Sequence, residues 1–159
     1  MKRRLPFSER AEYQIVKPTG KFAHENWLES TYATDFLLEL GTPLVAAEDG
    51  TVAIVKNDST TAFLPDGLAG LDENQIKNIS KKYTNYVGIR YVDGRYAEFL
   101  HIGKDVLVAE GDKVRKDQEI CYVGMNGITS EPHLHYNEFK IIWFELIGNR
   151  AISMPVEFE

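Results

Sequence analysis

Residues 86–102, YVGIRYVDGRYAEFLHI, hold the pattern that decides the fold. Apolar and aromatic side chains form two short runs on either side of Asp93 and Gly94, a dipeptide that favours the positive φ angles of a tight hairpin turn. Three more stretches follow the same plan: TPLVAAEDGTVAIVKN (42–57) with a hairpin turn at Asp49 and Gly50, VAEGDKVRKDQEICYVG (108–124) with a turn at Gly111 and Asp112, and PHLHYNEFKI (132–141), a strand that starts at Pro132. The sequence therefore predicts a mainly β protein built on an antiparallel sheet.

One segment, residues 58–85, breaks this β pattern. Asp72 and Gln75 have the spacing of a helix capping box, and apolar side chains then recur at helical spacing. We expect one inserted helix around residues 72–83. The insertion is either a surface excursion or a wall of a substrate groove, because long loops on rigid scaffolds often carry specificity.

Size and composition limit the class of protein. A chain of 159 residues, 43% of them hydrophobic, is predicted to form a single domain over residues 1–159. The 18 basic and 24 acidic residues give a net charge of -6, which leaves no broad positive surface for nucleic acid. The lone cysteine, Cys121, cannot form an internal disulfide, and its apolar neighbours indicate an inert buried thiol.

No targeting or membrane segment is expected. The first residues, MKRRLPFSERAEYQ, have only Leu5 and Phe7 as large apolar side chains before charge returns at Glu9, so they do not form a secretory signal. The most apolar stretch, IIWFELIG, is interrupted by Glu145 and is too short to cross a bilayer. We expect a soluble chain without membrane insertion.

The histidines carry the chemistry. His133 and His135 are two positions apart on a predicted strand, so they point to the same face with Cα atoms roughly 6.7 Å apart, and both imidazoles can approach one ion. Asp35 lies in an apolar run, where an unpaired carboxylate is costly, and therefore needs a cationic partner. His24, Asp35 and one histidine of the pair would supply the three-ligand set of a catalytic zinc, one ion per chain. His101 ends a strand and can act from outside that set.

Three blocks in order resemble one protein family. Residues 23–55 (AHENWLESTYATDFLLELGTPLVAAEDGTVAIV), 96–124 (YAEFLHIGKDVLVAEGDKVRKDQEICYVG) and 127–139 (GITSEPHLHYNEF) are similar to the lysostaphin-type, or LytM-like, zinc metalloendopeptidases, which cut peptidoglycan peptides. The resemblance implies a duplicated hybrid motif scaffold, a β-sandwich or barrel. Its peptidase core would span about 20–140, with N- and C-terminal extensions.

The resemblance also implies roles for single residues. The zinc ligands would be His24, Asp35 and His135, and His101 and His133 would flank the water that zinc activates. The implied function is zinc-dependent hydrolysis of peptide bonds in peptidoglycan stem or cross-link peptides. That substrate class implies the cell envelope or the extracellular space, while a cytoplasmic location stays open because no export signal is evident.

Two positions depart from the family pattern. Most members have the first histidine four positions before the aspartate, where this chain has Thr31, so His24 matches only the subset with a longer gap. Glu131 takes the place of the glycine that usually precedes the proline of P-H-L-H. The Glu131 side chain would either line the cleft or point into solvent.

Two other classes of protein remain open. GTPLVAAEDGTVAIV (41–55) and AEFLHIGKDVLVAEGDKVRKDQEI (97–120) also resemble the IIA phosphocarrier domain of glucose-type phosphotransferase systems, which uses two facing histidines. That domain does not need Asp35 with an H-x-H strand, so PHLHY speaks against it. The third alternative is a non-catalytic LytM-like module that binds or regulates cell-wall hydrolases, and Thr31 and Glu131 keep it open.

Overall fold

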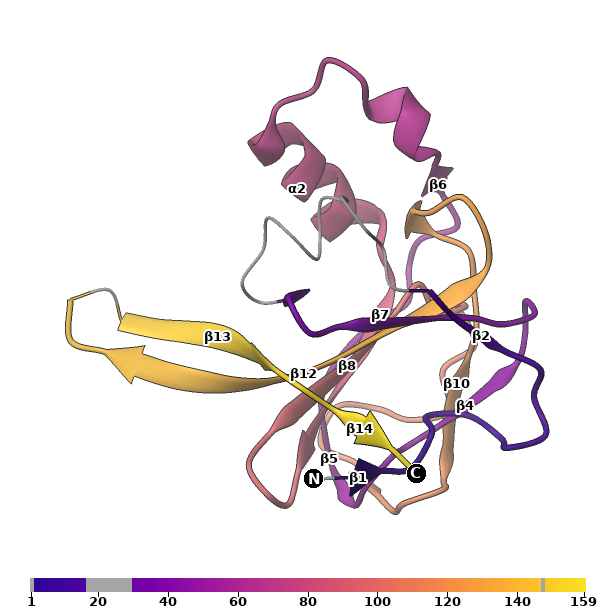
Figure 1. The fold of residues 1–159 in the computed structure, drawn as a ribbon, viewed down its shortest axis with the longest axis vertical. Coiled ribbons are helices and arrows are strands. Elements are labelled where there is room, and N and C mark those ends of the chain that lie inside the picture. The colour runs from indigo at the N-terminus through magenta and orange to yellow at the C-terminus, as the bar shows by residue number, and fades with distance from the viewer. Residues whose placement is uncertain (1, 17–29, 147) are drawn as a thin grey trace.

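A large antiparallel sheet forms the body of the protein in the computed structural model, which describes residues 2–16, 30–146 and 148–159 (Figure 1). Seven of its eight strands lie in the order β2-β3-β12-β8-β7-β5-β9, and the eighth, β13, pairs with the far part of β12. The bounds are β2 Gln14–Val16, β3 Thr34–Leu37, β5 Gly50–Lys56, β7 Tyr86–Tyr91, β8 Tyr96–Leu100, β9 Lys113–Val114, β12 His133–Phe144 and β13 Gly148–Met154. The predicted mainly β, antiparallel fold is confirmed.

Three small two-stranded sheets complete the scaffold. The first pairs β4 (Pro43–Val45) with β10 (Glu119–Tyr122), the second pairs β1 (Lys2–Arg3) with β14 (Glu157–Phe158), and the third pairs β6 (Ala62–Phe63) with β11 (Gly127–Ile128). The hydrophobic core takes side chains from the large sheet and from the β4–β10 sheet, among them Phe36, Leu134 and Ile120. Cys121 of β10 is fully buried, and burial raises the pKa of its thiol, as expected for an inert cysteine.

Of the two hairpins expected at Asp-Gly pairs, only one forms. β7 and β8 pair with each other around Asp93 and Gly94, and Gly94 has a positive φ of 83°. The prediction of a hairpin at Asp49 and Gly50 was wrong. The strands on either side of this turn do not pair with each other, because β4 pairs with β10 whereas β5 pairs with β7 and β9. Gly50 serves a different purpose, since a Cβ there would come within 2.7 Å of the Arg90 carbonyl oxygen on the neighbouring strand.

The insertion of residues 58–85 lies at one end of the sheet (Figure 1). It contains β6, a 3-10 helix η2 (Pro65–Leu68) and the helix α2 (Glu73–Tyr83). The predicted capping box is present: the Asp72 carboxylate accepts the Gln75 N–H, and the Gln75 side chain accepts the Asp72 N–H, both at 2.9 Å. Neither α2 nor any other helix in the described part of the chain is long and apolar enough to cross a membrane.

A two-stranded arm extends from the body (Figure 1). β12 pairs with β8 only as far as Phe139, opposite Tyr96, and continues beyond that point with β13 as its partner. Trp143 and Leu146 on this arm are 65% and 95% exposed. The first half of β12 therefore belongs to the body of the sheet, and its second half forms a ribbon.

A buried ion network ties the first strand to β12. Glu138 on β12 is completely buried, and it accepts hydrogen bonds from Arg3 Nε at 2.8 Å and from the Tyr136 hydroxyl at 2.8 Å. Arg3, itself 2% exposed, also contacts Asp93 at 2.6 Å, and Arg95 reaches Glu138 at 3.4 Å. The buried charges are thus paired, as buried charges must be.

We predict that Arg3→Ala destabilises the fold by about 3–5 kcal/mol, because it leaves Glu138 as a buried charge with one partner fewer. Lys116→Ala is the matched control, since it removes an exposed ion pair with Glu159 at 3.2 Å, and exposed pairs are worth at most about 1 kcal/mol. Chemical denaturation of both variants measures the difference. Equal losses would show that the buried network does not hold β1 in place.

Candidate active site

The pairing of β3 with β12 sets the centre of the site. Asp35 on β3 lies directly opposite His135 on β12, and Nδ1 of His135 is 2.8 Å from Oδ1 of Asp35. His135 is 5% exposed, while the Asp35 side chain is 16% exposed. The sequence predicted a cationic partner for Asp35, and the structure places the imidazole of His135 there, on the neighbouring strand.

The Asp35 carboxylate governs the charge of His135. Burial alone would lower the pKa of His135, but the hydrogen bond to Asp35 and the negative charge of that carboxylate outweigh burial and raise the pKa above 6.5. A neutral imidazole beside a carboxylate, or an imidazolium, are the two states that this pair can hold. In both states the Nδ1–H of His135 donates to the Asp35 carboxylate.

His101 approaches from the other neighbour of β12, immediately after β8. Its ring centroid is 4.5 Å from that of His133 and 6.3 Å from that of His135. Its Nδ1 is 2.7 Å from the main-chain carbonyl oxygen of Asn126. Because a carbonyl can only accept, Nδ1 carries the proton and Nε2 is left as an acceptor.

Burial also keeps His101 neutral. The ring is 8% exposed, and desolvation together with the nearby His133 lowers the pKa of His101 to about 3. The residue has a positive φ of 65°, which is uncommon for a residue other than glycine. A neutral imidazole held in this way, with its proton on Nδ1, can accept a hydrogen bond at Nε2.

His133 is held in the same way as His101. Its Nδ1 lies 3.0 Å from the Glu131 carbonyl oxygen and 3.1 Å from the Thr129 hydroxyl. The Thr129 hydroxyl in turn donates to the Glu131 carbonyl at 2.6 Å. The Glu131 side chain is exposed, so this residue serves the site through its main chain.

The structure thus brings together four of the five residues predicted from the sequence: His101, His133, His135 and Asp35. His24 lies outside the described residues. Thr31, which occupies the position of the usual first histidine, is described and exposed. Within residues 2–16, 30–146 and 148–159 there is no group of three or more His, Cys, Asp or Glu side chains placed to hold a metal ion.

Three residues at the site were missed by the sequence reasoning: Asn85, Asn126 and Thr129. Asn85 and Thr129 carry no local signal, because their contacts depend on segments far away in the chain. Asn126 precedes Gly127, a dipeptide typical of tight turns, so its pattern indicates a turn and not a site.

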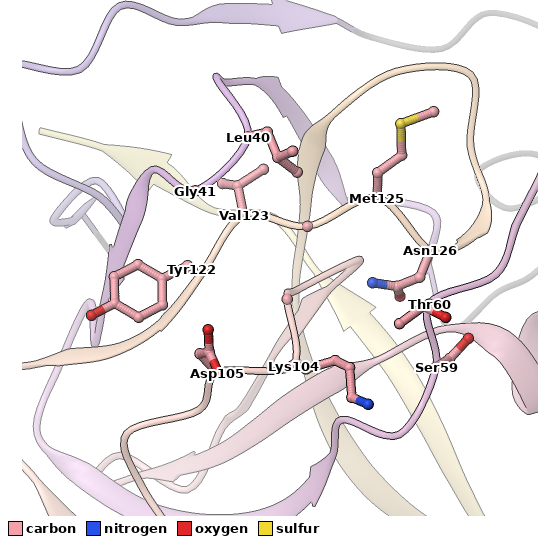
Figure 2. A pocket seen from close by; sticks show the side chains of 12 residues that line it. Leu40, Gly41, Ser59, Thr60, Lys104, Asp105, Tyr122, Val123, Met125 and Asn126 are labelled. Atoms are coloured by element: carbon pink, nitrogen blue, oxygen red, sulfur yellow. The ribbon is translucent and has the colours of Figure 1, made fainter.

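A hollow of about 510 Å³ adjoins the site through Asn126 (Figure 2). Leu40 and Met125 form one rim, and Ser59 and Lys104 lie on the opposite side. Asn126 therefore stands between this hollow and the ring of His101, whose Nδ1 its carbonyl contacts.

Residues 29–141 match the model of Peptidase family M23, so the chain belongs to this family. The match favours the peptidase interpretation over the phosphocarrier.

Two curated relatives agree with this assignment. The chain is 32% identical over 103 residues to Peptidoglycan DD-endopeptidase ShyA of Vibrio cholerae, which covers 65% of this chain and 19% of that protein. It is 34% identical over 107 residues to an uncharacterized metalloprotease of Haemophilus influenzae, and the match covers 67% of this chain and 18% of that protein. The chain spans about a fifth of the length of these two curated relatives.

Two solved structures share the fold. A zinc containing peptidase from Vibrio cholerae aligns with a TM-score of 0.56 at 21% identity, over 93% of this chain and 37% of that one. The catalytic domain of lysostaphin from Staphylococcus simulans aligns with a TM-score of 0.55 at 20% identity, over 87% and 88%. The predicted lysostaphin-type fold is confirmed.

Gly127, the first residue of β11, has no room for a side chain. A Cβ there would overlap the Thr84 hydroxyl, and the residue has a φ of 74°. Gly127→Ala should therefore lower the free energy of unfolding for two reasons, the strain of a left-handed backbone and the clash of the new methyl group. The clash should add about 1–3 kcal/mol to the strain, the usual range for overpacking.

Gly94→Ala is the control for Gly127→Ala, since Gly94 has a similar φ of 83° but open space around it. The left-handed backbone alone costs a residue other than glycine about 1–2 kcal/mol. Equal losses in the two variants, measured by chemical denaturation, would mean that Thr84 yields to the added methyl group.

Proposed function

We propose that this chain is a zinc-dependent endopeptidase that hydrolyses peptide bonds in peptidoglycan stem or cross-link peptides. The observation that carries the proposal is the 2.8 Å approach of Asp35 Oδ1 to His135 Nδ1, with His101 and His133 beside it. His135, Asp35 and His24 are the proposed ligands, and one zinc ion is expected per chain.

The described donors fit zinc. The ion prefers imidazole nitrogen and carboxylate oxygen, and catalytic sites use three protein ligands. His135 and Asp35 supply one donor of each kind from two strands that are hydrogen-bonded to each other, which holds the donors in register. When bound there, zinc supplies Lewis-acid chemistry, polarising a carbonyl group and making a water molecule more acidic.

The chain's own residues move the protons. His101 and His133 both have Nδ1 directed at a main-chain carbonyl, so each can present Nε2 to a substrate or to water. A neutral imidazole accepts a proton from an attacking water, and the imidazolium it becomes can donate that proton to the leaving amine. Such help is typically worth about 10²–10⁴ in rate.

The substrate class rests on the relatives. ShyA is named a peptidoglycan DD-endopeptidase, and lysostaphin is named an antimicrobial peptidase. Because peptidoglycan is part of the cell envelope, the proposed site of action is the cell envelope. The non-catalytic alternative, a module that binds wall hydrolases, predicts binding to sacculi without cleavage.

The test of the proposed function combines metal analysis with digestion of purified sacculi. The wild-type protein should hold about one zinc per chain and release soluble fragments, and a chelator should abolish release while added zinc restores it. Binding without release would favour the non-catalytic module. A folded protein that takes up no zinc on titration would overturn the enzyme.

Single variants separate the proposed ligands from the other histidines. Asp35→Ala and His135→Ala should lose zinc and activity together, whereas His133→Ala should keep zinc and lose about 10²–10⁴ in rate, the range of acid–base help. Asp66→Ala is the matched control, because Asp66 is an exposed aspartate in η2. If His133→Ala lost zinc as completely as His135→Ala, His133 would be a zinc ligand and its assignment as an acid–base residue would be wrong.

The first ligand needs its own experiment, since two positions compete for it. His24→Ala should weaken zinc binding more than Thr31→Ala does, because an imidazole is a far better zinc ligand than a hydroxyl. Competition with a coloured chelator measures both affinities. The reverse ranking would exclude His24.

A further inference from the structure

Two completely or almost completely buried asparagines lie beside His101. Asn85 is 0% exposed and Asn126 is 2% exposed. Asn85 is the last residue of the insertion, directly before β7, and Asn126 lies in the loop before β11. A buried amide is costly unless its polar atoms are hydrogen-bonded, so the partners of these two side chains show what they hold together.

The Asn85 side chain links the two ends of the insertion by hydrogen bonds. Its Oδ1 accepts the Ser59 N–H at 2.9 Å, and its Nδ2 donates to the Ser59 carbonyl at 2.8 Å. The same Nδ2 lies 3.3 Å from the carbonyl of Ile102, the residue after His101. Asn85 therefore joins both ends of the insertion to each other and to the His101 loop.

The Asn126 side chain extends this network. Its Oδ1 accepts the Asn85 N–H at 2.7 Å, and its Nδ2 donates to the Ile102 carbonyl at 2.6 Å. These two bonds fix the main chain of Asn126, whose carbonyl oxygen is the partner of His101 Nδ1 at 2.7 Å. The side chain of Asn126 thus holds the carbonyl that orients the imidazole.

The main chain of His101 is held by the same network. Its N–H donates to the Asn85 carbonyl at 2.9 Å, and its carbonyl accepts the Gly124 N–H at 2.9 Å. The positive φ of His101 costs about 1–2 kcal/mol, and such conformations persist only where the surroundings determine them. Asn85 thus holds the main-chain N–H of His101, and Asn126 holds its ring.

We propose that Asn85 and Asn126 are positioning residues that fix the orientation and the Nδ1–H tautomer of His101, and that they make the 58–85 insertion part of the active site's support. This inference rests on the proposed function in one respect, namely that His101 acts on the reacting water. The insertion is then neither a free surface excursion nor only a groove wall, because its two ends meet at a residue that holds a histidine.

The kinetic test is a double-mutant cycle between Asn126 and His101. Asn126→Ala should lower kcat by about 10–100-fold, the usual effect of residues that orient site groups, with KM and zinc content unchanged. In a His101→Ala background the same substitution should have no further effect, because Asn126 acts through that ring. An equal further loss in that background would overturn the positioning role.

The matched control is Asn57→Ala. The Asn57 side chain also donates to a carbonyl of the same loop, that of Lys104 at 2.7 Å, but none of its contacts reaches His101. It should leave kcat unchanged. A drop as large as that of Asn126→Ala would show that the loop as a whole, and not the asparagine pair, supports the histidine.

A second readout does not depend on activity. Long-range ¹H–¹⁵N spectra of the wild-type protein report the tautomer of His101, and Nδ1–H is expected, with the two tautomers mixed in Asn126→Ala. An Nε2–H tautomer in the wild type would overturn the proposal without any variant. If His101 has the expected tautomer but sacculi are not cleaved, the proposed function fails while the positioning role stands.

Discussion

The register of β12 between β3 and β8 is the constraint on which the described site depends. Alternate side chains of this strand point to opposite faces, and Leu134 and Tyr136 are buried in the core. The same alternation sends His133 and His135 to the other face, where Asp35 lies opposite His135. A slip of one residue would move the core side chains to the face of the site and the histidines into the core, so the core itself enforces the geometry of the site.

The same strand carries structural support on its further part. Glu138 is buried three residues beyond His135, and its partners come from the first strand and from the turn between β7 and β8. Arg3 and Arg95 balance its charge, and the Tyr136 hydroxyl uses another of its acceptor positions. β12 therefore divides along its length into a functional segment, an anchored segment and the exposed arm.

Local patterns in the sequence predicted the parts of this structure that depend on local physics. The capping box of Asp72 and Gln75 and the β7–β8 turn form because neighbouring residues suffice to make them. The shared face of His133 and His135 follows from strand alternation alone. The Asp49–Gly50 hairpin failed because its strands find better partners elsewhere, a choice that only the complete sheet decides.

The same distinction between local patterns and long-range contacts applies to the site residues. Asp35 and His101 could be selected from their surroundings in the chain, since a carboxylate in an apolar run and a histidine at a strand end are local anomalies. That Asp35 stands opposite His135, 100 positions away, is a property of the sheet register. Asn85 and Asn126 could not be selected, because an asparagine before a strand or before a glycine is ordinary and only their mutual contact is unusual.

Main-chain carbonyls explain how this site accommodates Glu131, one of its two departures from the family pattern. His101 and His133 are each oriented by a carbonyl oxygen, that of Asn126 and that of Glu131. A carbonyl is supplied by any residue, so glutamate can stand where glycine is usual provided that the backbone path is kept and the side chain reaches solvent, as it does here. What must be preserved is the set of groups that fixes the path, and these are the Thr129 hydroxyl for His133 and the asparagine amides for His101. The geometry of such a site therefore depends partly on buried polar residues that orient its histidines.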